Sequence, residues 1–320
     1  MKVAVLDDWQ RIAETYADWT ALRSKAEVVF FHDAFSNADD AAQRLHDFEV
    51  LMAMRERTAF PESLVRRLPK LRLFSMTGSR GGSVDMAAMR AQGVTITGTS
   101  AGGTGTSTSE LALALMLASA RNIALADAAM RRGGFLEDVA PGYELYGKVL
   151  GLVGLGRLGQ SMAQYGAVLG MKVIAWSQNL TPDRAAAAGA VYAAKEELLA
   201  TSDVVSLHLV LSDRTRGILG AAELARMKAG ALLINTSRGP LVDEKALIAA
   251  LEAGRISAAL DVYDREPLSA DHPFRRLPNT LLTPHIGYGS IATYRDFYRE
   301  AVENVLAFLD GKPIRVLQPA

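Results

Sequence analysis

The chain has 320 residues, more than one hydrophobic core usually organises, so its length predicts about two domains. Its 35 basic residues balance 35 acidic ones, which leaves no electrostatic argument for binding nucleic acid or an acidic membrane surface. The absence of cysteine excludes disulfides, thiol nucleophiles and cysteine-ligated metals, and it suits a reducing compartment.

The apolar stretches of the chain are too short to cross a membrane. The opening MKVAVLDDW places four apolar residues before two aspartates, fewer than a signal-peptide core needs. The longest apolar stretch, residues 111–120, is about half a membrane span and lies between Glu110 and Arg121. We therefore expect a cytoplasmic protein that binds neither membrane nor nucleic acid.

Short β-rich runs alternate with amphipathic stretches in the first part of the chain. This alternation predicts a parallel sheet covered by helices. The stretch at residues 85–93 carries helix signals at both ends, because Asp85 can cap its start and Gly93 can end it. The five runs, enough for a small α/β domain, are VAVL at 3, VVFF at 28, VLMAM at 50, LRLFSM at 71 and VTIT at 94.

A second series of strands follows a loop rich in glycine, serine and threonine, GTSAGGTGTSTSE, whose composition predicts a domain boundary. We expect a long helix from Glu110 to about Met130, and a helical tail from roughly Ser290. The strands of this second α/β unit are VLGLVG at 149, KVIAW at 172, DVVSLHL at 203, ALLIN at 231, SAALDV at 257 and TLLTP at 280.

Gly154, Gly156 and Gly159 stand between an apolar strand and a helix, in the run GLVGLGRLGQ. In this setting the first glycine makes a tight turn, the second lets backbone approach a pyrophosphate, and the third allows close helix–strand packing. The phosphate charge would meet the positive end of the helix. The pattern predicts a dinucleotide site, although an unrelated sheet can also contain a glycine-rich turn.

The end of the next strand bears on the choice between NAD and NADP. An NAD site normally has an acidic residue there, which accepts hydrogen bonds from the ribose. Here the strand ends VIAWSQN and the position is Ser177. Serine does not repel a 2′-phosphate, but no basic residue follows until Arg184, in a helix expected to begin with Thr181 and Pro182. We expect weak discrimination, with NAD slightly ahead of NADP.

Three motifs lie at the carboxyl ends of strands in the second unit, where open α/β sheets bind ligands. NTSRGPLVDEKAL holds Arg238, LDVYDREP holds Glu266, and LLTPHIGYG holds His285. Each alone has an ordinary structural explanation, but together they suit a 2-oxo acid. An arginine can bind its carboxylate with two charge-assisted hydrogen bonds. A histidine can protonate its carbonyl oxygen as hydride reaches the carbon, and a neighbouring glutamate would raise the histidine pKa.

These motifs, together with GKVLGLVGLGRLGQ and DVVSLHLVL, occur in the order and at the spacing of one family. Over nearly its whole length the chain resembles the D-isomer-specific 2-hydroxyacid dehydrogenases, of the phosphoglycerate dehydrogenase and glyoxylate/hydroxypyruvate reductase kind. The resemblance implies that Arg238 binds the substrate, that Glu266 is the partner carboxylate and that His285 is the acid/base. It also implies cofactor contacts from Thr104, Gly154, Gly156, Arg157, Leu158, Gly159, Ser177, Thr236, Ser237, Asp261 and Gly287.

The same resemblance implies a domain organisation. A Rossmann dinucleotide-binding domain, residues 99–289, would be inserted into a flavodoxin-like substrate domain formed by residues 1–98 and 290–320, with the active site between them. Both domains would be doubly wound parallel sheets. The family also implies a homodimer through the cofactor domain. One departure is the missing proline after His208, which predicts a local change in how that loop meets the cofactor.

In the first domain, the run TGSRGGSVD at residues 77–85 would bind the substrate carboxylate, because its glycines leave backbone NH groups accessible. Ser79, Arg80 and Gly81 in this loop and Arg55 in AMRERTAF are candidate substrate-binding residues. The two arginines could bind a second phosphate or carboxylate group of a substrate, and solvated loop arginines are an equally supported alternative. No spacing of His, Asp and Glu resembles a metal site.

Two functions of different classes follow from these patterns. The first is NAD(P)-dependent hydride transfer between the nicotinamide cofactor and a small D-2-hydroxy acid or 2-oxo acid, with formate or phosphite as a close variant of substrate. The second is a non-catalytic scaffold or corepressor of the same fold that senses NAD. The joint presence of Arg238, Glu266 and His285 favours turnover.

Overall fold

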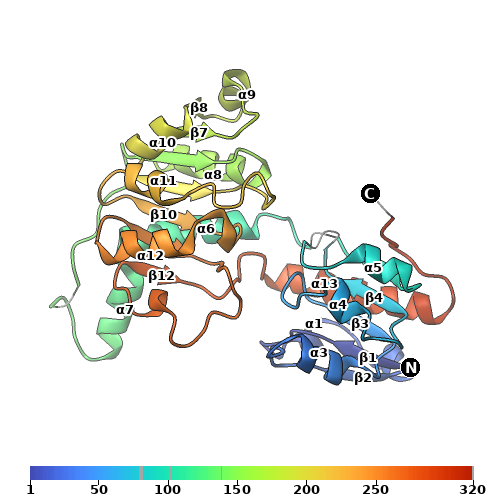
Figure 1. Ribbon diagram of the computed structural model, residues 1–320. Helices are drawn as coiled ribbons and strands as arrows, with labels where there is room; N and C mark the ends of the chain where they lie inside the picture. The colour runs from blue at the N-terminus through green and yellow to red at the C-terminus, as the bar shows by residue number, and fades with distance from the viewer. Residues whose placement is uncertain (79–81, 101, 138, 319–320) are drawn as a thin grey trace. The chain divides into compact units, whose positions relative to one another are not determined.

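The structure, a computed structural model, describes residues 1–78, 82–100, 102–137 and 139–318 (Figure 1). The chain divides into two compact units. Unit 1 comprises Met1–Gly105 and Gly289–Ala320, and unit 2 comprises Thr106–Tyr288. Each unit contains one parallel sheet, so the two-sheet α/β class expected from the alternating pattern is confirmed.

The sheet of unit 1 has five strands in the order β2-β1-β3-β4-β5. The chain adds β2 on one side of β1 and then places β3 on the other side, which creates a switch point between β1 and β3. Open α/β sheets bind ligands outside the carboxyl ends of their strands at such a point. The strands are β1 (Lys2–Val5), β2 (Glu27–Phe30), β3 (Val50–Ala53), β4 (Leu73–Met76) and β5 (Thr95–Gly98).

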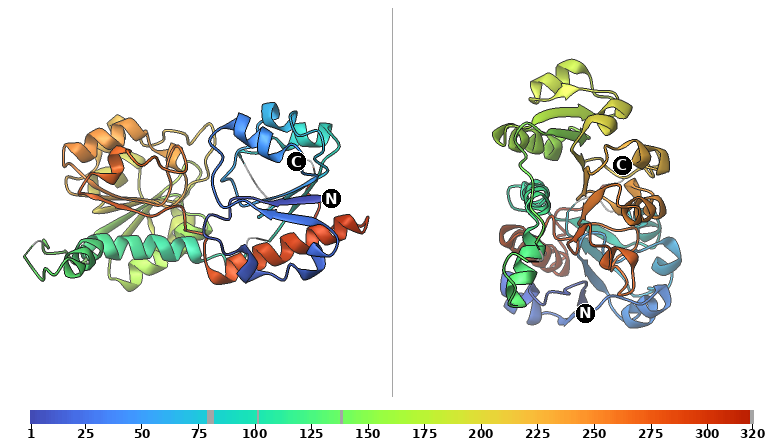
Figure 2. Two further views of the ribbon diagram at one scale, coloured as in Figure 1. Left: turned by 90° about the horizontal axis from the view of Figure 1, so that it is seen from below. Right: turned by 90° about the vertical axis from the view of Figure 1, so that its left-hand side faces the viewer.

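Helices cover both faces of this sheet, as a doubly wound fold requires. They are α1 (Ala13–Tyr16), α2 (Thr20–Arg23), α3 (Ala38–Leu45), α4 (Glu62–Val65), α5 (Met86–Ala91) and α13 (Ile291–Leu309). Figure 2 shows α13 along one face and α3, α4 and α5 along the other. The strands β3 and β4 are therefore buried along their whole length.

The C-terminal segment covers the edge strand β5. Gly98 donates its backbone NH to the carbonyl of Arg315 at 3.0 Å, and Leu317 donates to the carbonyl of Ile96 at 2.9 Å. An uncovered edge strand would expose its backbone groups to other chains, so this segment completes the sheet.

The sheet of unit 2 has seven strands in the order β12-β11-β10-β9-β6-β7-β8. Its switch point lies between β6 and β9, because the chain adds β7 and β8 on one side before it returns to the other. The strands are β6 (Val149–Val153), β7 (Lys172–Trp176), β8 (Val191–Tyr192), β9 (Val204–Leu207), β10 (Leu232–Asn235), β11 (Ser257–Leu260) and β12 (Thr280–Leu282). The two-residue strand β8 is not among the predicted runs.

The helices of unit 2 include the two predicted from cap signals and glycine turns. They are α6 (Ser107–Ala120), α7 (Ile123–Arg131), α8 (Arg157–Val168), α9 (Pro182–Ala187), α10 (Lys195–Thr201), α11 (Ala221–Arg226) and α12 (Glu244–Glu252). Thr181 caps α9 by accepting from the backbone NH of Arg184, as predicted. In unit 1, Asp85 caps α5 in the same way through the NH of Ala88.

The prediction of one helix from Glu110 to about Met130 is wrong, because the chain turns at Asn122. The helix α6 ends at Ala120 and α7 begins at Ile123, with a bend of 66° between them. Asn122 has a φ of +51°, a left-handed conformation that ends a helix and that asparagine adopts more readily than most residues. Among the described helices, none is by itself long and apolar enough to span a membrane, and only this bent pair meets that criterion when its two helices are joined.

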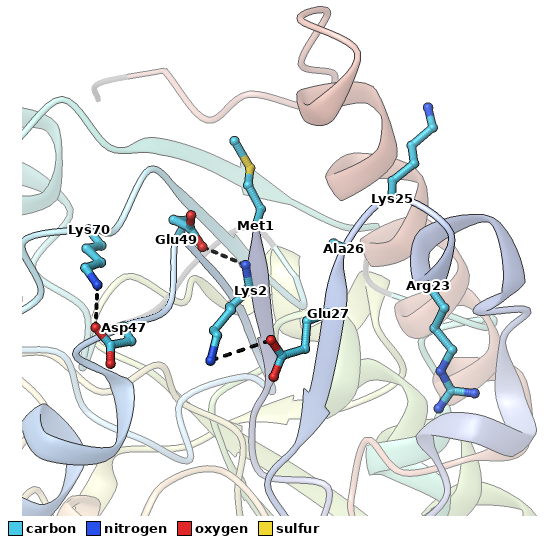
Figure 3. Close-up of a pocket in the computed structure, with 9 residues that line it drawn as sticks. All are labelled: Met1, Lys2, Arg23, Lys25, Ala26, Glu27, Asp47, Glu49 and Lys70. Atoms are coloured by element: carbon cyan, nitrogen blue, oxygen red, sulfur yellow. Dashed lines mark hydrogen bonds and ion pairs between the residues drawn. The ribbon is translucent and has the colours of Figure 1, made fainter.

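A hollow of about 750 Å³ lies at the amino end of the unit 1 sheet (Figure 3). Two ion pairs lie within it, since Lys2 Nζ lies 3.5 Å from Glu27 Oε2 and Lys70 Nζ lies 2.5 Å from Asp47 Oδ1. This end is opposite to the carboxyl ends of the strands, where ligands of α/β sheets bind.

Candidate active site

His285 and Glu266 form a close pair beyond the carboxyl ends of β12 and β11. The distance from His285 Nδ1 to Glu266 Oε2 is 2.6 Å. The second carboxylate oxygen, Oε1, accepts the backbone NH of Tyr263 at 3.0 Å, which fixes the carboxylate against its own loop. Both side chains are about one-fifth exposed, so the pair can be reached from solvent.

The loop that carries His285 is held by a buried carboxylate, Asp261, directly after β11. Its two oxygens accept the backbone NH groups of Ile286 at 2.9 Å and Gly287 at 2.8 Å. A third bond comes from the hydroxyl of Thr283 at 2.7 Å. Burial raises the pKa of Asp261 above its ordinary value, and these hydrogen bonds oppose the shift. His285 itself has a φ of +53°, so the loop holds a backbone conformation that is strained for a histidine.

Arg238 follows β10 and is positioned by the side chain of Asn235. The amide Nδ2 of Asn235 donates to the carbonyl of Arg238 at 2.9 Å, and its Oδ1 accepts the NH of Ser237 at 3.0 Å. The hydroxyl of Ser237 donates to the carbonyl of Leu207 in β9 at 2.7 Å, which ties this turn to the neighbouring strand. The guanidinium Nη1 of Arg238 donates to the carbonyl of Ser237 at 2.7 Å.

Gly239 packs the arginine turn directly against the loop that carries Glu266. A Cβ at this position would lie 2.1 Å from the backbone carbon of Tyr263 and 2.5 Å from the nitrogen of Asp264. No side chain larger than hydrogen fits there. The structure thus brings the loops of Arg238, Glu266 and His285 together at one edge of the unit 2 sheet.

The glycine turn after β6 has the geometry of a phosphate-binding site. Gly154 has a φ of +103°, and a Cβ there would lie 2.6 Å from the carbonyl oxygen of His208. A Cβ at Gly159 would lie 2.2 Å from the carbonyl oxygen of Gly154, so the first turn of α8 packs tightly on the strand end. A Cβ at Gly156 would meet no atom within 4 Å, which leaves open space in front of the N-terminus of α8. This arrangement fits the pyrophosphate of a dinucleotide.

Two buried polar atoms just after β9 and β10 could form hydrogen bonds with a bound molecule. Within the described part of the chain, His208 Nδ1 and Thr236 Oγ1 are buried and have no hydrogen-bond partner. His208 Nε2 lies 2.9 Å from the hydroxyl of Ser206. Burial lowers the pKa of His208 to about 4, so its ring is neutral at physiological pH. A neutral ring can accept or donate a hydrogen bond without a cost in charge.

The other predicted cofactor residues are distributed over both units. Arg157 and Leu158 begin α8, and Ser177 follows β7, where its carbonyl accepts the NH of Leu180 at 3.0 Å. Gly287 lies in the histidine loop. Thr104, by contrast, belongs to unit 1.

The predicted substrate residues belong to unit 1. Arg55 follows β3, and its Nη1 would lie 2.5 Å from a Cβ at Gly78, so the guanidinium rests on the backbone of the 77–85 loop. The predictions for Ser79, Arg80 and Gly81 lie outside the described residues.

Two positioning residues were not singled out from the sequence, Asn235 and Tyr263. Besides its backbone bond to Glu266, Tyr263 donates its hydroxyl towards the carbonyls of Leu260 and Thr283, at 3.1 and 2.9 Å, and so links β11 to β12. Both residues stand within the quoted motifs. The available signal was a polar side chain at the end of a buried strand.

Comparison with known proteins agrees with this geometry. The family model described as D-isomer specific 2-hydroxyacid dehydrogenase, NAD binding domain, matches residues 113–287. The chain is 37% identical over 257 residues to the glyoxylate reductase of Aeropyrum pernix, which covers 78% of this chain and 76% of that protein. It is 33% identical over 308 residues to the glyoxylate/hydroxypyruvate reductase B of Klebsiella pneumoniae, which covers 94% and 91%.

A solved structure extends the match to the whole fold. The phosphoglycerate oxidoreductase from Vibrio cholerae has a TM-score of 0.91 and 36% identity, over 97% of this chain and 99% of that chain. The family resemblance seen in the motifs is therefore confirmed. The chain belongs to the D-isomer specific 2-hydroxyacid dehydrogenases, NAD-dependent oxidoreductases, and its NAD-binding domain lies within unit 2.

Proposed function

We propose that the protein reduces a small 2-oxo acid to the D-2-hydroxy acid, reversibly, with His285 as acid/base and Arg238 as the carboxylate-binding residue. The observation that carries this proposal is the 2.6 Å contact between His285 Nδ1 and Glu266 Oε2 at the carboxyl edge of the NAD-binding unit. When bound, the nicotinamide ring supplies or accepts the hydride.

The chemistry assigned to the chain is the transfer of one proton. Glu266 occupies Nδ1 of His285, so Nε2 is the ring atom that would give the proton to the carbonyl oxygen of the 2-oxo acid. The hydrogen bond between Glu266 and Nδ1 fixes the orientation of the ring. In the oxidative direction the same atom would take the hydroxyl proton. The arginine fork would hold the substrate carboxylate with two hydrogen bonds.

The names of the relatives support small 2-oxo acids as the substrate class. They include a glyoxylate reductase, a glyoxylate/hydroxypyruvate reductase and a phosphoglycerate oxidoreductase. Glyoxylate and hydroxypyruvate are accordingly the first substrates to test, followed by pyruvate, phenylpyruvate and oxaloacetate.

The test is the loss of reduced-nicotinamide absorbance with this panel. Replacing His285 by Asn should lower kcat by roughly two to four orders of magnitude, because the proton donor is removed, and should leave NADH binding nearly unchanged. His272→Asn is the matched control, since His272 also pairs with a carboxylate, Glu244 at 3.2 Å, in the same unit. Unchanged turnover in His285→Asn would show that His285 is not the acid/base. If NADH binds but no acid in the panel is reduced, the result would favour a formate-like substrate or the non-catalytic scaffold.

For the cofactor, we propose that NAD is preferred slightly over NADP. Ser177 carries no charge that would repel a 2′-phosphate, and Arg184 donates to the carbonyl of Asn179 at 2.9 Å in the loop that follows Ser177. The serine and this nearby cation support weak discrimination rather than strict selection.

For assembly, we propose a homodimer formed through unit 2. The supporting observation is a set of exposed apolar side chains on α7 and the segment that follows it. Large exposed apolar surfaces of this kind commonly mark protein interfaces. The set comprises Ile123, Leu125, Met130, Phe135 and Leu136.

A further inference from the structure

The segment of residues 55–58 follows β3 at the switch point of the unit 1 sheet and makes contacts on two sides. On one side it meets Gly78 and Gly82, which belong to the loop predicted from the sequence to bind the substrate carboxylate. The guanidinium of Arg55 rests on Gly78, and Glu56 Oε1 accepts the backbone NH of Gly82 at 2.9 Å. The backbone NH of Arg55 is itself fixed by the hydroxyl of Thr77 at 2.8 Å.

On its other side the segment is attached to the end of β1 through Asp7. The hydroxyl of Thr58 donates to Asp7 Oδ1 at 2.8 Å, and Nη1 of Arg57 donates to the Asp7 carbonyl at 2.8 Å. The guanidinium of Arg57 also lies 4.8 Å from the ring centroid of Trp9, a cation–π distance. Asp7, two residues after β1, therefore holds both Arg57 and Thr58 in place.

Asp7 lowers the stability of the folded chain in two ways. It is 1% exposed, its φ is +59°, and its Oδ2 has no partner among the described residues. A buried carboxylate with one oxygen unsatisfied and a left-handed backbone both cost stability. Burial raises the pKa of Asp7 to about 6, because removal from water disfavours the charged carboxylate. Costs of this kind concentrate at functional sites.

We infer that Asp7 is a positioning residue for the substrate. Through Thr58 and Arg57 it fixes the backbone of residues 55–58, and thereby the side chains of Arg55 and Glu56 that contact Gly78 and Gly82. The inference rests on the proposed function and on the predicted role of this loop in binding the substrate. Asp7 belongs to unit 1, whereas the residues assigned to proton transfer belong to unit 2. Its removal should therefore change substrate binding and leave the chemical step alone.

The experiment is a set of steady-state measurements with the 2-oxo acid that the wild-type enzyme reduces best. Asp7→Ala should raise the KM for that acid about tenfold and change kcat by less than about twofold, because uniform binding is lost. The KM for NADH should not move. Asp7→Asn should restore the KM to within about threefold, since the amide oxygen still accepts from Thr58.

Thr58→Val removes the same hydrogen bond from the other partner and should raise the KM in the same way, which covers the case that Asp7→Ala does not fold. The double variant should be no worse than either single variant, because both remove one interaction. Asp33→Ala is the matched control, an exposed carboxylate of unit 1 that pairs with Arg44 at 2.9 Å.

Two results would overturn the positioning role. One is a KM that stays at the wild-type value in both Asp7→Ala and Thr58→Val. The other is an equal fall of kcat and kcat/KM with KM unchanged. Failure of the wild-type enzyme to reduce any acid in the panel would instead overturn the proposed function, so the two failures are distinguishable.

Discussion

The ring of His285 depends on two carboxylates that act from different directions. Glu266 contacts the ring at Nδ1, whereas Asp261 holds the backbone after the histidine through Ile286 and Gly287. Both carboxylates belong to the short segment after β11. A displacement of that segment would therefore move the ring and its partner together and would keep their distance.

A negative charge at position 177 should increase the preference of the enzyme for NADH over NADPH. Ser177→Asp should raise the ratio of kcat/KM for NADH to that for NADPH by about tenfold or more, because a carboxylate accepts from the ribose and repels a 2′-phosphate. Initial rates with both cofactors check this. Ser177→Asn, which is similar in size but uncharged, should change the ratio by less than about threefold. A ratio that does not respond to Asp would mean that Ser177 does not face the ribose.

At this scale the sequence was most informative where chemistry restricts the residue type. The glycines at 154, 156 and 159 could be assigned separate tasks, and their packing in the structure agrees with those tasks. His285 and Glu266 were paired on chemical grounds and lie in contact, while their catalytic roles stay predictions. Asn235 could not be recognised, because its task is to hold backbone atoms whose positions exist only in the folded chain.

Among the elements, the strands were well predicted and one helix was not. Parallel strands buried on both faces form continuous apolar runs, so they can be seen in the sequence. The break between α6 and α7 is a single-residue event at Asn122, and the helix before it, α6, gives little periodic signal. The strand β8 was missed because two residues carry no pattern.

The exposed apolar set on α7 and the following segment gives the dimer proposal its test. Phe135 and Leu136 are 67% and 72% exposed. Replacing both by Asp should convert a dimer into a monomer, because charges would have to be buried at the interface. Size-exclusion chromatography with light scattering measures the mass.

The control for this variant is Val191→Asp, which places the same charge on an exposed residue of the edge strand β8 in the same unit. It should leave the mass unchanged. A wild-type monomer, or a double variant that remains dimeric, would contradict the role of this set.

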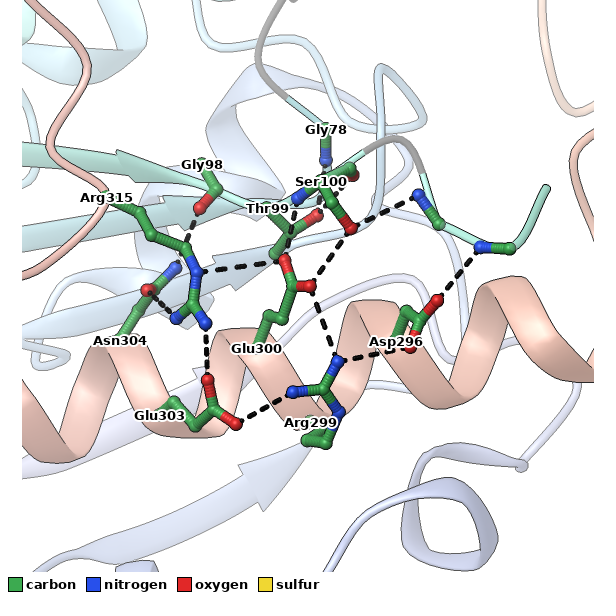
Figure 4. Close-up of polar contacts among 12 residues, drawn as sticks. Gly78, Gly98, Thr99, Ser100, Asp296, Arg299, Glu300, Glu303, Asn304 and Arg315 are labelled. Atoms are coloured by element: carbon green, nitrogen blue, oxygen red, sulfur yellow. Dashed lines mark hydrogen bonds and ion pairs between the residues drawn. The ribbon is translucent and has the colours of Figure 1, made fainter. Parts of the chain in front are cut away.

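At the scale of the whole molecule, the chain passes between the units twice, after Gly105 and after Tyr288. Within unit 1, the segment that leads to the first crossing is bound to the helix α13, which begins just after the second (Figure 4). The buried carboxylate of Glu300 accepts two hydrogen bonds from Ser100, one from the backbone NH at 2.7 Å and one from the side-chain hydroxyl at 3.0 Å. Asp296 accepts the NH of Gly103 at 2.9 Å. Both connections are thus anchored to one helix.

Replacing Glu300 by Gln should lower the free energy of unfolding by about 2 kcal/mol, because the charge-assisted hydrogen bonds from Ser100 become neutral ones. Arg299 lies 3.4 Å and Arg315 3.8 Å from its oxygens. Glu303→Gln is the control on the same helix, because Glu303 pairs with the same arginines but its side chain is 39% exposed, and it should cost less than about 1 kcal/mol. Urea unfolding measures both. Equal losses would mean that the anchor contributes no more than a surface ion pair.

The strand pairing of Arg315 and Leu317 with β5 has a consequence for how the protein is made. Unit 2 is one continuous stretch and is complete while the last helix is still unsynthesised. The unit that contains the first residue is therefore the last to be finished. At ribosomal rates of about 5–20 residues per second, the segment that pairs with β5 is synthesised on the order of tens of seconds after β5 itself. During that interval β5 has an unpaired edge. Another chain can pair with that edge until the C-terminal segment covers it.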